Sequence, residues 1–417
     1  MEIELNKPDL SQLEGFLTSL TFNLVETYNI DHNIIRKHTK KLTTLGDISF
    51  PVNIKSWFHL LKEKASIEVQ TIFNYSKTIS TTEDLINLSK LWNYPINKAV
   101  NVNGNCHIYL DKPVAFKKTI VDVLKEASKY GSYNMNKSLT LTTDVVNDDN
   151  LLLTELRVLL LMKVANNFLI FNNCSKTNGE IIKLCSKSLV NDDVIVCGPI
   201  LNSKGSKDTE TTSKVYYDQR TLDMRLMAEH KYGLRITSKP GWEEFFAKLG
   251  SAAVIIEMLQ NRPNNCTTID INNHYIKNAS FILYNCARLS TLLKEFEKRV
   301  SENVYPPLID IDEINFSLLE QPEEWELLYV YILQFPVLLK NCIKDIDTCK
   351  INVHYLVAHL GSMTSVFSGY YRRIKILIEP RDYLFNVLHA RIYLLKALEQ
   401  VFHNGLKLLD IEPVKQM

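Results

Sequence analysis

The residues of this chain that are best suited to chemistry are aromatic and basic side chains at helical spacing. The segment F-I-L-Y-N-C-A-R-L-S carries Phe281, Tyr284 and Arg288 at steps of three and four residues, so a helix places them on one face. A ring can stack on an unpaired base, and a guanidinium can bind a phosphate or a base edge. The spacing therefore indicates a surface for single-stranded RNA. The alternative is a core tyrosine beside a structural salt bridge.

A second segment, M-T-S-V-F-S-G-Y-Y-R-R-I-K-I-L, interleaves aromatic and basic residues. Single-stranded RNA needs positive charge for its phosphates and π-faces for its bases, and this composition offers both. As a pattern alone, Y-Y-R-R is common on solvated helix faces, and that alternative stays open. The candidates in this segment, together with one lysine that follows the first motif, are Phe367, Tyr371, Arg372, Arg373, Lys375 and Lys294.

Two basic runs in the first third of the chain are suited to following a nucleic-acid backbone. Runs of this kind more often form a solubilising surface, so both interpretations are kept. The stretch 310–326 is acidic and does not favour RNA; it is a protein-docking face or a solvated one. The basic residues of the two runs are Arg36, Lys37, Lys40 and Lys41 in the first, and Lys117, Lys118, Lys125 and Lys129 in the second.

Composition is that of an ordinary folded protein and does not point to a partner. The 417 residues allow two or three domains, and 48 Lys+Arg against 47 Asp+Glu leave no global charge to attract nucleic acid. Any RNA site must therefore be a local patch. No apolar run approaches a membrane span and no secretory signal is visible, so a cytoplasmic protein is expected. Eight cysteines without a C-x-x-C pair predict buried thiols in a reducing compartment and no metal site.

The sequence lacks the motifs of enzymes that handle nucleotides. It contains no H-x-G-H segment of class I synthetases, no P-loop and no G-x-G-x-x-G, and nothing in it resembles the glycine-rich turn that holds S-adenosylmethionine. The string Y-N-M-N-K-S at Tyr133 is too short and too simple to count as a K-M-S-K-S loop. No nucleophile and base can be nominated together. We therefore expect no catalytic residue and no cofactor.

Hydrophobic periodicity predicts a mixed fold, with α/β character in the first and middle parts and an all-helical C-terminal bundle. In the first part we expect helices at 13–25 and 119–130 and a strand at 101–112. The three parts are predicted as domains at 1–135, 136–275 and 276–417.

The middle part alternates strand-like and helix-like stretches. Residues 156–165 fit a buried strand or a buried helix, 167–171 fit a strand, and 193–201 fit a strand that runs into a Gly-Pro turn. A polar, turn-rich loop at 202–214 separates them from two amphipathic helices. In the last part, the final helix buries one apolar face, and Gly405 inside its pattern is a candidate turn.

The C-terminal third resembles the DALR anticodon-binding domain of arginyl-tRNA synthetases. The resemblance rests on F-I-L-Y-N-C-A-R-L-S and on the closing helix H-A-R-I-Y-L-L-K-A-L-E-Q-V-F-H-N-G-L-K-L-L-D-I-E-P-V-K-Q-M. It implies that Phe281, Tyr284 and Arg288 lie against the anticodon loop, with a phenylalanine where the family carries a tyrosine. It also implies that Phe367 and Tyr371 face the anticodon from a second helix, and that the terminal methionine, Met417, packs nearby.

The first part more loosely resembles the N-terminal add-on domain of these synthetases, which touches the tRNA elbow. The middle part would then be a degenerate, non-catalytic remnant of the synthetase body.

Within the DALR group, the chain is identified as a member of the DALR anticodon-binding domain-containing protein 3 family. The matching residues are K-Y-G-L-R-I from Lys231, G-W-E-E-F-F-A-K-L-G-S-A-A-V-I-I-E-M-L, and F-I-L-Y-N-C-A-R-L-S-T-L-L. This resemblance implies a non-catalytic adaptor that binds arginine tRNAs and supports a methyltransferase-like partner forming 3-methylcytidine in the anticodon loop. Two alternatives remain: a divergent aminoacyl-tRNA synthetase with residual ATP-dependent activity, and a helical protein-interaction module.

Overall fold

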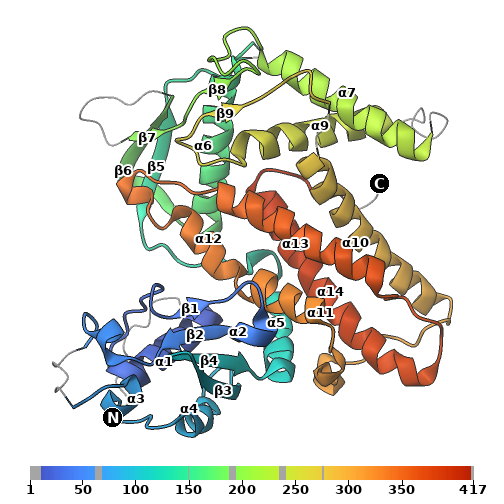
Figure 1. Cartoon of the computed structure of the whole chain (residues 1–417). Coiled ribbons are helices and arrows are strands. Elements are labelled where there is room, and N and C mark those ends of the chain that lie inside the picture. Colours follow the sequence, from blue (N-terminus) through green and yellow to red (C-terminus); the bar gives the residue numbers. More distant parts are fainter. Residues whose placement is uncertain are drawn as a thin grey trace. The chain divides into compact units, whose positions relative to one another are not determined.

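The structure of the chain is a computed structural model (Figure 1) that describes residues 11–61, 68–148, 150–186, 194–233, 241–274 and 277–414. Contacts between Cα atoms divide the chain into two units, and each unit is assembled from three separate stretches. Unit 1 comprises Met1–Glu126, Val300–Val337 and Lys375–Leu398. Unit 2 comprises Ala127–Arg299, Leu338–Ile374 and Glu399–Met417. The C-terminal third therefore contributes to both units.

Unit 1 contains a four-stranded antiparallel sheet in the order β1-β2-β4-β3. The predicted single strand at 101–112 is wrong, because the chain reverses there through Asn103 and Gly104, both at positive φ (50° and 76°). An Asn-Gly pair suits the tight turn of a hairpin, which requires such backbone angles. The strands are β1 (Arg36–Lys37), β2 (Ile48–Pro51), β3 (Ile96–Val102) and β4 (Asn105–Leu110).

Helices of unit 1 bury their apolar residues in its core. The predicted helix at 13–25 is confirmed as α1 (Gln12–Val25), which begins with a capping box between Ser11 and Glu14. The helix predicted at 119–130 is the second half of α5 (Lys112–Glu126), followed by the turn η2 (Ala127–Lys129). The other helices and turns of the first 126 residues are α2 (Leu42–Leu45), η1 (Ile54–Trp57), α3 (Ile72–Tyr75) and α4 (Thr82–Ser89).

The second stretch of unit 1 packs against β2 through Asp47, the residue that precedes this strand. It contains η3 (Ile311–Glu313), η4 (Phe316–Leu318), α11 (Pro322–Glu326) and the π-helical segment η5 (Leu327–Leu333). The Trp325 indole Nε1 donates to the Asp47 carboxylate at 2.7 Å, and the Tyr329 hydroxyl donates to the Asp47 carbonyl at 2.6 Å. These buried bonds join residues that are 278 and 282 positions apart in the sequence.

One apolar helical stretch contradicts an expectation from the sequence. Among the residues that the structure describes, Pro322–Thr348 is long and apolar enough to cross a membrane, with a mean hydropathy of 1.3 in its most apolar part. This stretch includes α11, η5, α12 (Phe335–Ile343) and η6 (Ile346–Thr348). In the fold, 61% of its most apolar part is buried within the protein. Burial of this extent is typical of a core helix, and a single such helix is weak evidence for a membrane.

Unit 2 begins with a parallel sheet of β5 (Ser138–Thr143), β6 (Ser175–Cys185) and β7 (Val194–Val196), crossed by α6 (Leu153–Phe171). The open choice for 156–165 is settled as a helix, and the strand predicted at 167–171 is wrong because α6 continues through it. The strand predicted at 193–201 is confirmed as β7 and β8 (Ile200–Leu201), separated by the Gly-Pro turn. The strand β8 pairs in parallel with β9 (Thr267–Thr268).

Arg157 of α6 joins this helix to three other backbone segments of unit 2. Its guanidinium is buried and donates to four backbone carbonyls, at distances between 2.6 and 3.2 Å. The acceptors belong to the turn before β8, to the end of a later helix and to the loop that follows it. Because buried carbonyls need partners, one arginine satisfies backbone groups that no strand ladder reaches. The acceptor residues are Gly198, Met258, Arg262 and Asn265.

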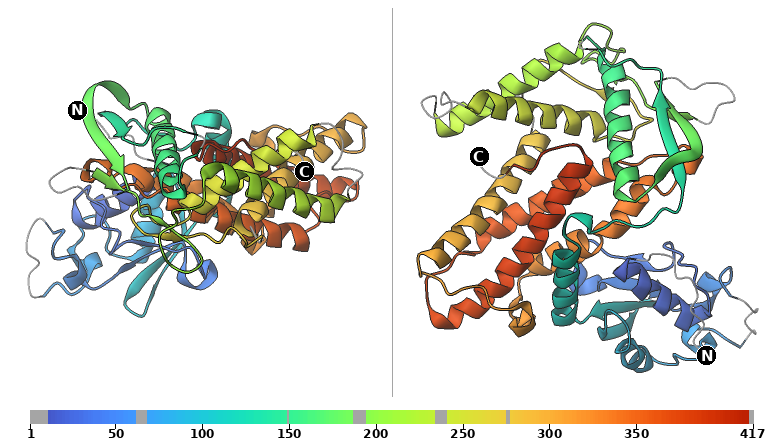
Figure 2. Two further views of the ribbon diagram at one scale, coloured as in Figure 1. Left: turned by 90° about the horizontal axis from the view of Figure 1, so that it is seen from above. Right: turned by 180° about the vertical axis from the view of Figure 1, so that it is seen from behind.

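The two helices α7 (Ser213–Tyr232) and α9 (Trp242–Leu259) lie side by side (Figures 1 and 2). Both were predicted; for the first, the sequence indicated a helix at 219–232, and α7 begins six residues before that range. Their close approach requires Gly250, because a Cβ there would lie 2.7 Å from the Cα of Thr221. A glycine at this point therefore brings the two backbones close together.

The remaining helices of unit 2 belong to the C-terminal third, which is helical as predicted. They are α10 (Lys277–Ser301), α13 (His354–Arg373) and the last turns of α14 (Asp382–Leu408). The candidate turn at Gly405 is wrong, because α14 continues through it. A Cβ at Gly405 would meet the Leu360 side chain at 3.0 Å, so this glycine allows α14 to pack closely on α13. The predicted fold class is confirmed: mixed α/β regions are followed by an all-helical C-terminal domain.

Candidate nucleic-acid interface

The helix α10 carries the first sequence-predicted cluster. It runs for 25 residues without glycine or proline, so side chains four positions apart stand one above the other on the same face. Tyr284 and Arg288 use this spacing. The guanidinium carbon of Arg288 lies 4.4 Å from the Tyr284 ring centroid, and its Nη2 donates to the Tyr284 hydroxyl at 2.8 Å.

Tyr371 from α13 completes a stack around the same guanidinium, whose carbon lies 4.8 Å from the Tyr371 ring centroid. Arg288 is therefore held between two rings from two helices of unit 2. Its Nη1 donates to the amide oxygen of Asn285 at 3.1 Å. Tyr371 is 39% exposed, so part of its ring surface remains open to solvent. The sequence predicted all three stacked residues as site candidates, and the structure brings them into contact.

The charge of Arg288 is not neutralised by an acid. Within the described parts of the chain, its polar partners are a tyrosine hydroxyl and a neutral amide, and no carboxylate pairs with it. A half-buried guanidinium held by rings and an amide keeps its full positive charge and has N–H groups left over. This arrangement suits an anionic or hydrogen-bonding ligand that arrives from solvent.

Phe367 departs from its predicted role. Its side chain is fully buried, at 0% exposure, so the prediction that its ring faces a base is wrong in this structure. The ring lies 6.1 Å from that of Tyr371 and supports Tyr371 from the core side. Phe281 is half-buried on α10, and its backbone carbonyl accepts a hydrogen bond from the Asn285 amide at 2.9 Å.

The basic candidates around this stack are divided between the two units. In unit 2, Lys294, Arg372 and Arg373 are exposed, and the Arg372 Nε donates to the Ser368 carbonyl at 3.3 Å. Lys375 belongs to unit 1, where it lies 3.8 Å from the Glu379 carboxylate. The predicted position of Met417 falls outside the residues that the structure describes.

The basic run at 36–41 lies on the sheet of unit 1. Arg36 faces Ser49, which in turn faces His107 in the strand ladder, so these side chains share one sheet face. Arg36, Lys40 and Lys41 are exposed, and Lys37 is half-buried. These four residues therefore stand at one edge of a four-stranded sheet.

The same sheet face carries residues that the sequence did not single out. The Nζ of Lys98 lies 5.6 Å from the Tyr109 ring centroid, and the His107 Nδ1 lies 2.8 Å from the Leu45 carbonyl. His38 bonds to the Ser49 hydroxyl at 2.8 Å; burial and the charges of His107 and Arg36 hold its pKa below the usual value. The signal available in the sequence was the alternation N-C-H-I-Y-L, which places His107 and Tyr109 on one face.

The second basic run is partly engaged in structural contacts; its first three lysines belong to unit 1, and Lys129 belongs to unit 2. Lys117 pairs with the Asp312 carboxylate at 2.9 Å, and Lys118 donates to the Asn93 side chain at 2.7 Å. Asp312 belongs to the acidic stretch 310–326, so this stretch acts in part as an intramolecular partner for lysine. Lys125 and Lys129 are exposed.

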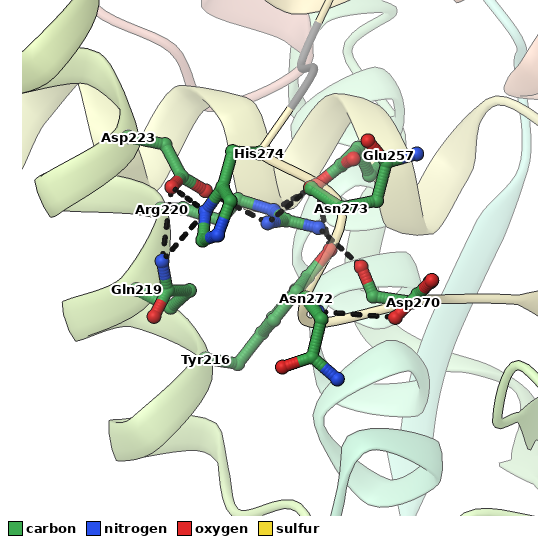
Figure 3. Close-up of polar contacts among 9 residues, drawn as sticks. All are labelled: Tyr216, Gln219, Arg220, Asp223, Glu257, Asp270, Asn272, Asn273 and His274. Carbon is green, nitrogen blue, oxygen red and sulfur yellow. Dashed lines mark hydrogen bonds and ion pairs between the residues drawn. The ribbon is translucent and has the colours of Figure 1, made fainter.

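A second arginine cluster, unforeseen from the sequence, joins α7 to α9 (Figure 3). Arg220 is 2% exposed; its Nε donates to Glu257 at 2.7 Å, and its Nη1 donates to Asp223 at 2.8 Å. Its remaining N–H groups reach the carbonyls of Asn273 and Asp270, at 3.2 and 3.4 Å. The Arg220 guanidinium therefore pins the loop that leads into α10.

Two further side chains close this network. His274 shares a hydrogen bond of 2.8 Å with Asp223 through its Nδ1, and the Tyr216 hydroxyl donates to Glu257 at 2.6 Å (Figure 3). Burial and the Glu257 charge raise the pKa of Tyr216. Burial alone would lower the pKa of Arg220, but Tyr216 and Glu257 raise it above its usual value. Both carboxylates and the guanidinium are thus satisfied internally.

Comparison with known proteins defines the class of this fold. Residues 282–417 match the family model described as DALR anticodon binding domain. In structure, the chain is similar to the arginyl-tRNA synthetase of Thermus thermophilus, with a TM-score of 0.63 at 10% identity, over 92% of this chain and 96% of that one. The chain therefore has an arginyl-tRNA-synthetase-like fold that contains a DALR domain.

Sequence comparison narrows this class. The chain is 32% identical over 230 residues to the DALR anticodon-binding domain-containing protein 3 of Mus musculus, and 28% identical over 236 residues to that of Danio rerio. The matches cover 54% of this chain and 43% and 41% of the two relatives, so the chain spans less than half of their length. An arginine–tRNA ligase of Malacoplasma penetrans is 29% identical over 135 residues, 32% of this chain and 21% of the ligase. The resemblance to the DALR anticodon-binding domain-containing protein 3 family is confirmed.

Proposed function

We propose that the chain is a tRNA-binding adaptor whose α10–α13 surface faces the anticodon loop of arginine tRNAs. The observation that carries the proposal is the Arg288 guanidinium, which is held between Tyr284 and Tyr371 and lacks a carboxylate partner among the described residues. An unpaired base can stack on the open part of Tyr371, and the guanidinium can bind a phosphate or base edge beside it. The DALR domain match over 282–417 supports this assignment.

The sheet face in unit 1 is a second contact region in this proposal. Arg36 and Lys98 supply positive charge there, and the half-buried Tyr109 supplies ring surface. Contacts of this kind fix the position of an RNA without reading its sequence, because they address its backbone and any ring face. A tRNA could thus be recognised at its anticodon loop and held elsewhere by charge.

The proposal also covers the cellular compartment, the absence of aminoacylation and the partner enzyme. The adaptor acts in the cytoplasm without catalysing aminoacylation, and it presents the anticodon loop to a methyltransferase-like partner that forms 3-methylcytidine. The missing H-x-G-H segment supports the absence of aminoacylation, since no other nucleotide motif replaces it. The partner itself is proposed from the resemblance to the DALR anticodon-binding domain-containing protein 3 family.

A direct experiment tests the RNA and the modification together. RNA that co-purifies with the tagged full chain is sequenced with modification mapping, for the wild type and for Arg288→Ala. We expect arginine tRNAs to be enriched by the wild type and depleted in the variant. Arg225→Ala is a matched control, because it removes the same charge from an exposed helical position where Arg225 pairs with Glu229 at 2.8 Å. Equal RNA recovery by Arg288→Ala and Arg225→Ala would contradict the proposed surface.

The remaining alternative is a divergent synthetase, and the similarity over 92% of the chain to a synthetase fold keeps it worth testing. Arginine-dependent ATP–pyrophosphate exchange by the purified chain, with and without tRNA, separates the two functions. We expect no exchange above background. Exchange that requires both arginine and tRNA would replace the adaptor by an enzyme.

A further inference from the structure

Asn285 is a buried polar residue in the middle of α10, between the two members of the Tyr284–Arg288 pair. Its side chain is 0% exposed. A buried amide is unfavourable in a helix core unless both of its ends are bonded. In this structure both ends are: Nδ2 donates to the Phe281 carbonyl at 2.9 Å, and Oδ1 accepts from the Arg288 Nη1 at 3.1 Å.

The chemistry of these partners fixes the orientation of the amide. A backbone carbonyl can only accept, so the NH₂ end of Asn285 must point to Phe281. A guanidinium can only donate, so the oxygen end must point to Arg288. The two bonds together hold one acceptor at a fixed place beside the Arg288 guanidinium.

We propose that Asn285 is a positioning residue for RNA binding, which acts by holding the Arg288 guanidinium between the rings of Tyr284 and Tyr371. This proposal rests on the proposed function of the α10–α13 surface. A neutral acceptor is the group that this task requires. It orients the guanidinium and leaves its charge for a phosphate or a base, whereas a carboxylate at the same place would consume that charge.

The energetic consequence is specific. An arginine side chain that is free to rotate must be ordered when RNA binds, and this ordering lowers affinity. Losing the Asn285 bond is expected to weaken tRNA binding by about threefold to tenfold, the scale of one hydrogen bond. Stability should change little in Asn285→Leu, because the apolar replacement keeps the core filled and the Phe281 carbonyl retains its helical backbone partner.

The first experiment measures positioning without RNA. The full chain is treated with phenylglyoxal, which modifies accessible arginines, and the modification rate of Arg288 is followed by mass spectrometry. We expect a severalfold faster rate in Asn285→Leu and a rate no faster than that of the wild type in Asn285→Asp, because the new carboxylate keeps the guanidinium in place and protonated. Asn285→Ala serves as the second variant if the leucine variant does not fold. An unchanged rate in folded Asn285→Leu or Asn285→Ala would overturn the positioning role.

The second experiment links Asn285 to RNA through a double-mutant cycle. Affinity for an arginine tRNA transcript is measured for the wild type, Asn285→Leu, Arg288→Ala and the double variant. If Asn285 acts through Arg288, the leucine change weakens binding in the wild type but adds nothing in the Arg288→Ala background. Equal losses in both backgrounds would overturn the proposal in favour of a structural role.

The two experiments also separate this proposal from the proposed function. If phenylglyoxal modification accelerates but neither single change alters tRNA affinity, the RNA-facing role of the surface is overturned. Asn285 would then still order Arg288, but not for RNA. If Arg288→Ala weakens binding and Asn285→Leu does not, the proposed function stands and the positioning role of Asn285 is overturned.

Discussion

Tyr216 and Arg220 on α7 and Tyr284 and Arg288 on α10 share a spacing of four residues. In both pairs the guanidinium carbon lies over the tyrosine ring, at 4.9 Å on α7 and 4.4 Å on α10. Their surroundings differ. Arg220 is buried and bonded to two carboxylates and two backbone carbonyls, whereas Arg288 is half-buried and bonded to a hydroxyl and an amide.

This difference shows that the Tyr-x-x-x-Arg spacing alone does not decide the role of the arginine. The groups that bond to the guanidinium beside the tyrosine decide it: carboxylates for Arg220, and a neutral amide for Arg288. A guanidinium between carboxylates is neutralised, and its role is structural: it holds the loop in place. A guanidinium between rings and an amide keeps its charge for a ligand. The same Tyr-x-x-x-Arg spacing thus gives a structural clamp on α7 and a candidate binding group on α10.

The largest effect is expected from breaking the clamp. Arg220→Ala leaves Asp223 and Glu257 as buried or partly buried carboxylates without their cation, and it frees two loop carbonyls. We expect a loss of about 3–5 kcal/mol in the free energy of unfolding, the scale for an opened buried ion pair. Urea melts of the variant and of Arg288→Ala measure the contrast. Equal stability losses in the two variants would erase the distinction drawn between the arginines.

Asp47 in unit 1 is a buried carboxylate that forms no salt bridge with another described residue, and it extends the comparison to that unit. Burial raises the pKa of Asp47 to about 6, although the Leu110 N–H, the Trp325 indole and the Lys112 charge favour its ionised form. Because the pKa in the folded state is raised, the stabilisation from protonated Asp47 is present below about pH 4 and is lost as the pH rises through about 6.

The unfolding free energies of the wild type and Asp47→Asn isolate this contribution. We expect the wild type to lose about 2 kcal/mol relative to the variant between pH 4 and pH 7. The variant is also destabilised at every pH, because the NH₂ group of its new amide and the Leu110 N–H are both donors and face each other. A difference that stays constant across this range would mean that Asp47 does not titrate there.

Arg288→Ala should affect binding, with only a modest effect on folding. We expect affinity for an arginine tRNA to fall by about 1–3 kcal/mol, the range of one good base or phosphate contact. The unfolding free energy should fall by about 1–2 kcal/mol, because the buried Asn285 oxygen loses its donor, and by less than in Arg220→Ala, because no carboxylate is left unpaired among the described residues. Melting temperature and tRNA affinity are measured on the same sample. A marked loss of stability with affinity per folded molecule unchanged would remove Arg288 from the interface.

The smallest effect is expected when Arg288 on α10 is given a carboxylate partner like those of Arg220 on α7. Asn285→Asp places a carboxylate against Arg288 and should neutralise it while keeping it in position. We expect the slope of log affinity against log salt to become shallower by about one unit. Asn285→Leu is the matched control, since it leaves the charge of Arg288 intact and should keep the slope. Identical slopes in all three proteins would indicate that Arg288 does not contact a phosphate.

The sequence predicted the helical C-terminal domain and three residues that meet in the stack, because long helices with regular apolar spacing can be read locally. The sequence did not predict the contacts between residues far apart in the chain, and it did not predict the hairpin turn in unit 1. Arg220 meets Glu257 across 37 residues and Asp223 meets His274 across 51, and no local pattern encodes such pairs. The Asn103–Gly104 hairpin did carry a local signal, and the apolar run of α6 could have been recognised by its length. Phe367 shares a helix face with Tyr371, and only packing reveals which of the two rings reaches solvent.

Gly250 fixes the position of α7 along α9. At this point the backbone of α9 approaches the backbone of α7 at Thr221 without an intervening side chain. The axial position of α7 on α9 fixes where Arg220 meets Glu257, and Arg220 fixes the carbonyls of Asp270 and Asn273 a few residues before α10 begins. A shift of α7 along α9 would therefore also move the loop that Arg220 holds. The absence of a side chain at Gly250 therefore bears on the loop that precedes α10, the helix that carries Arg288.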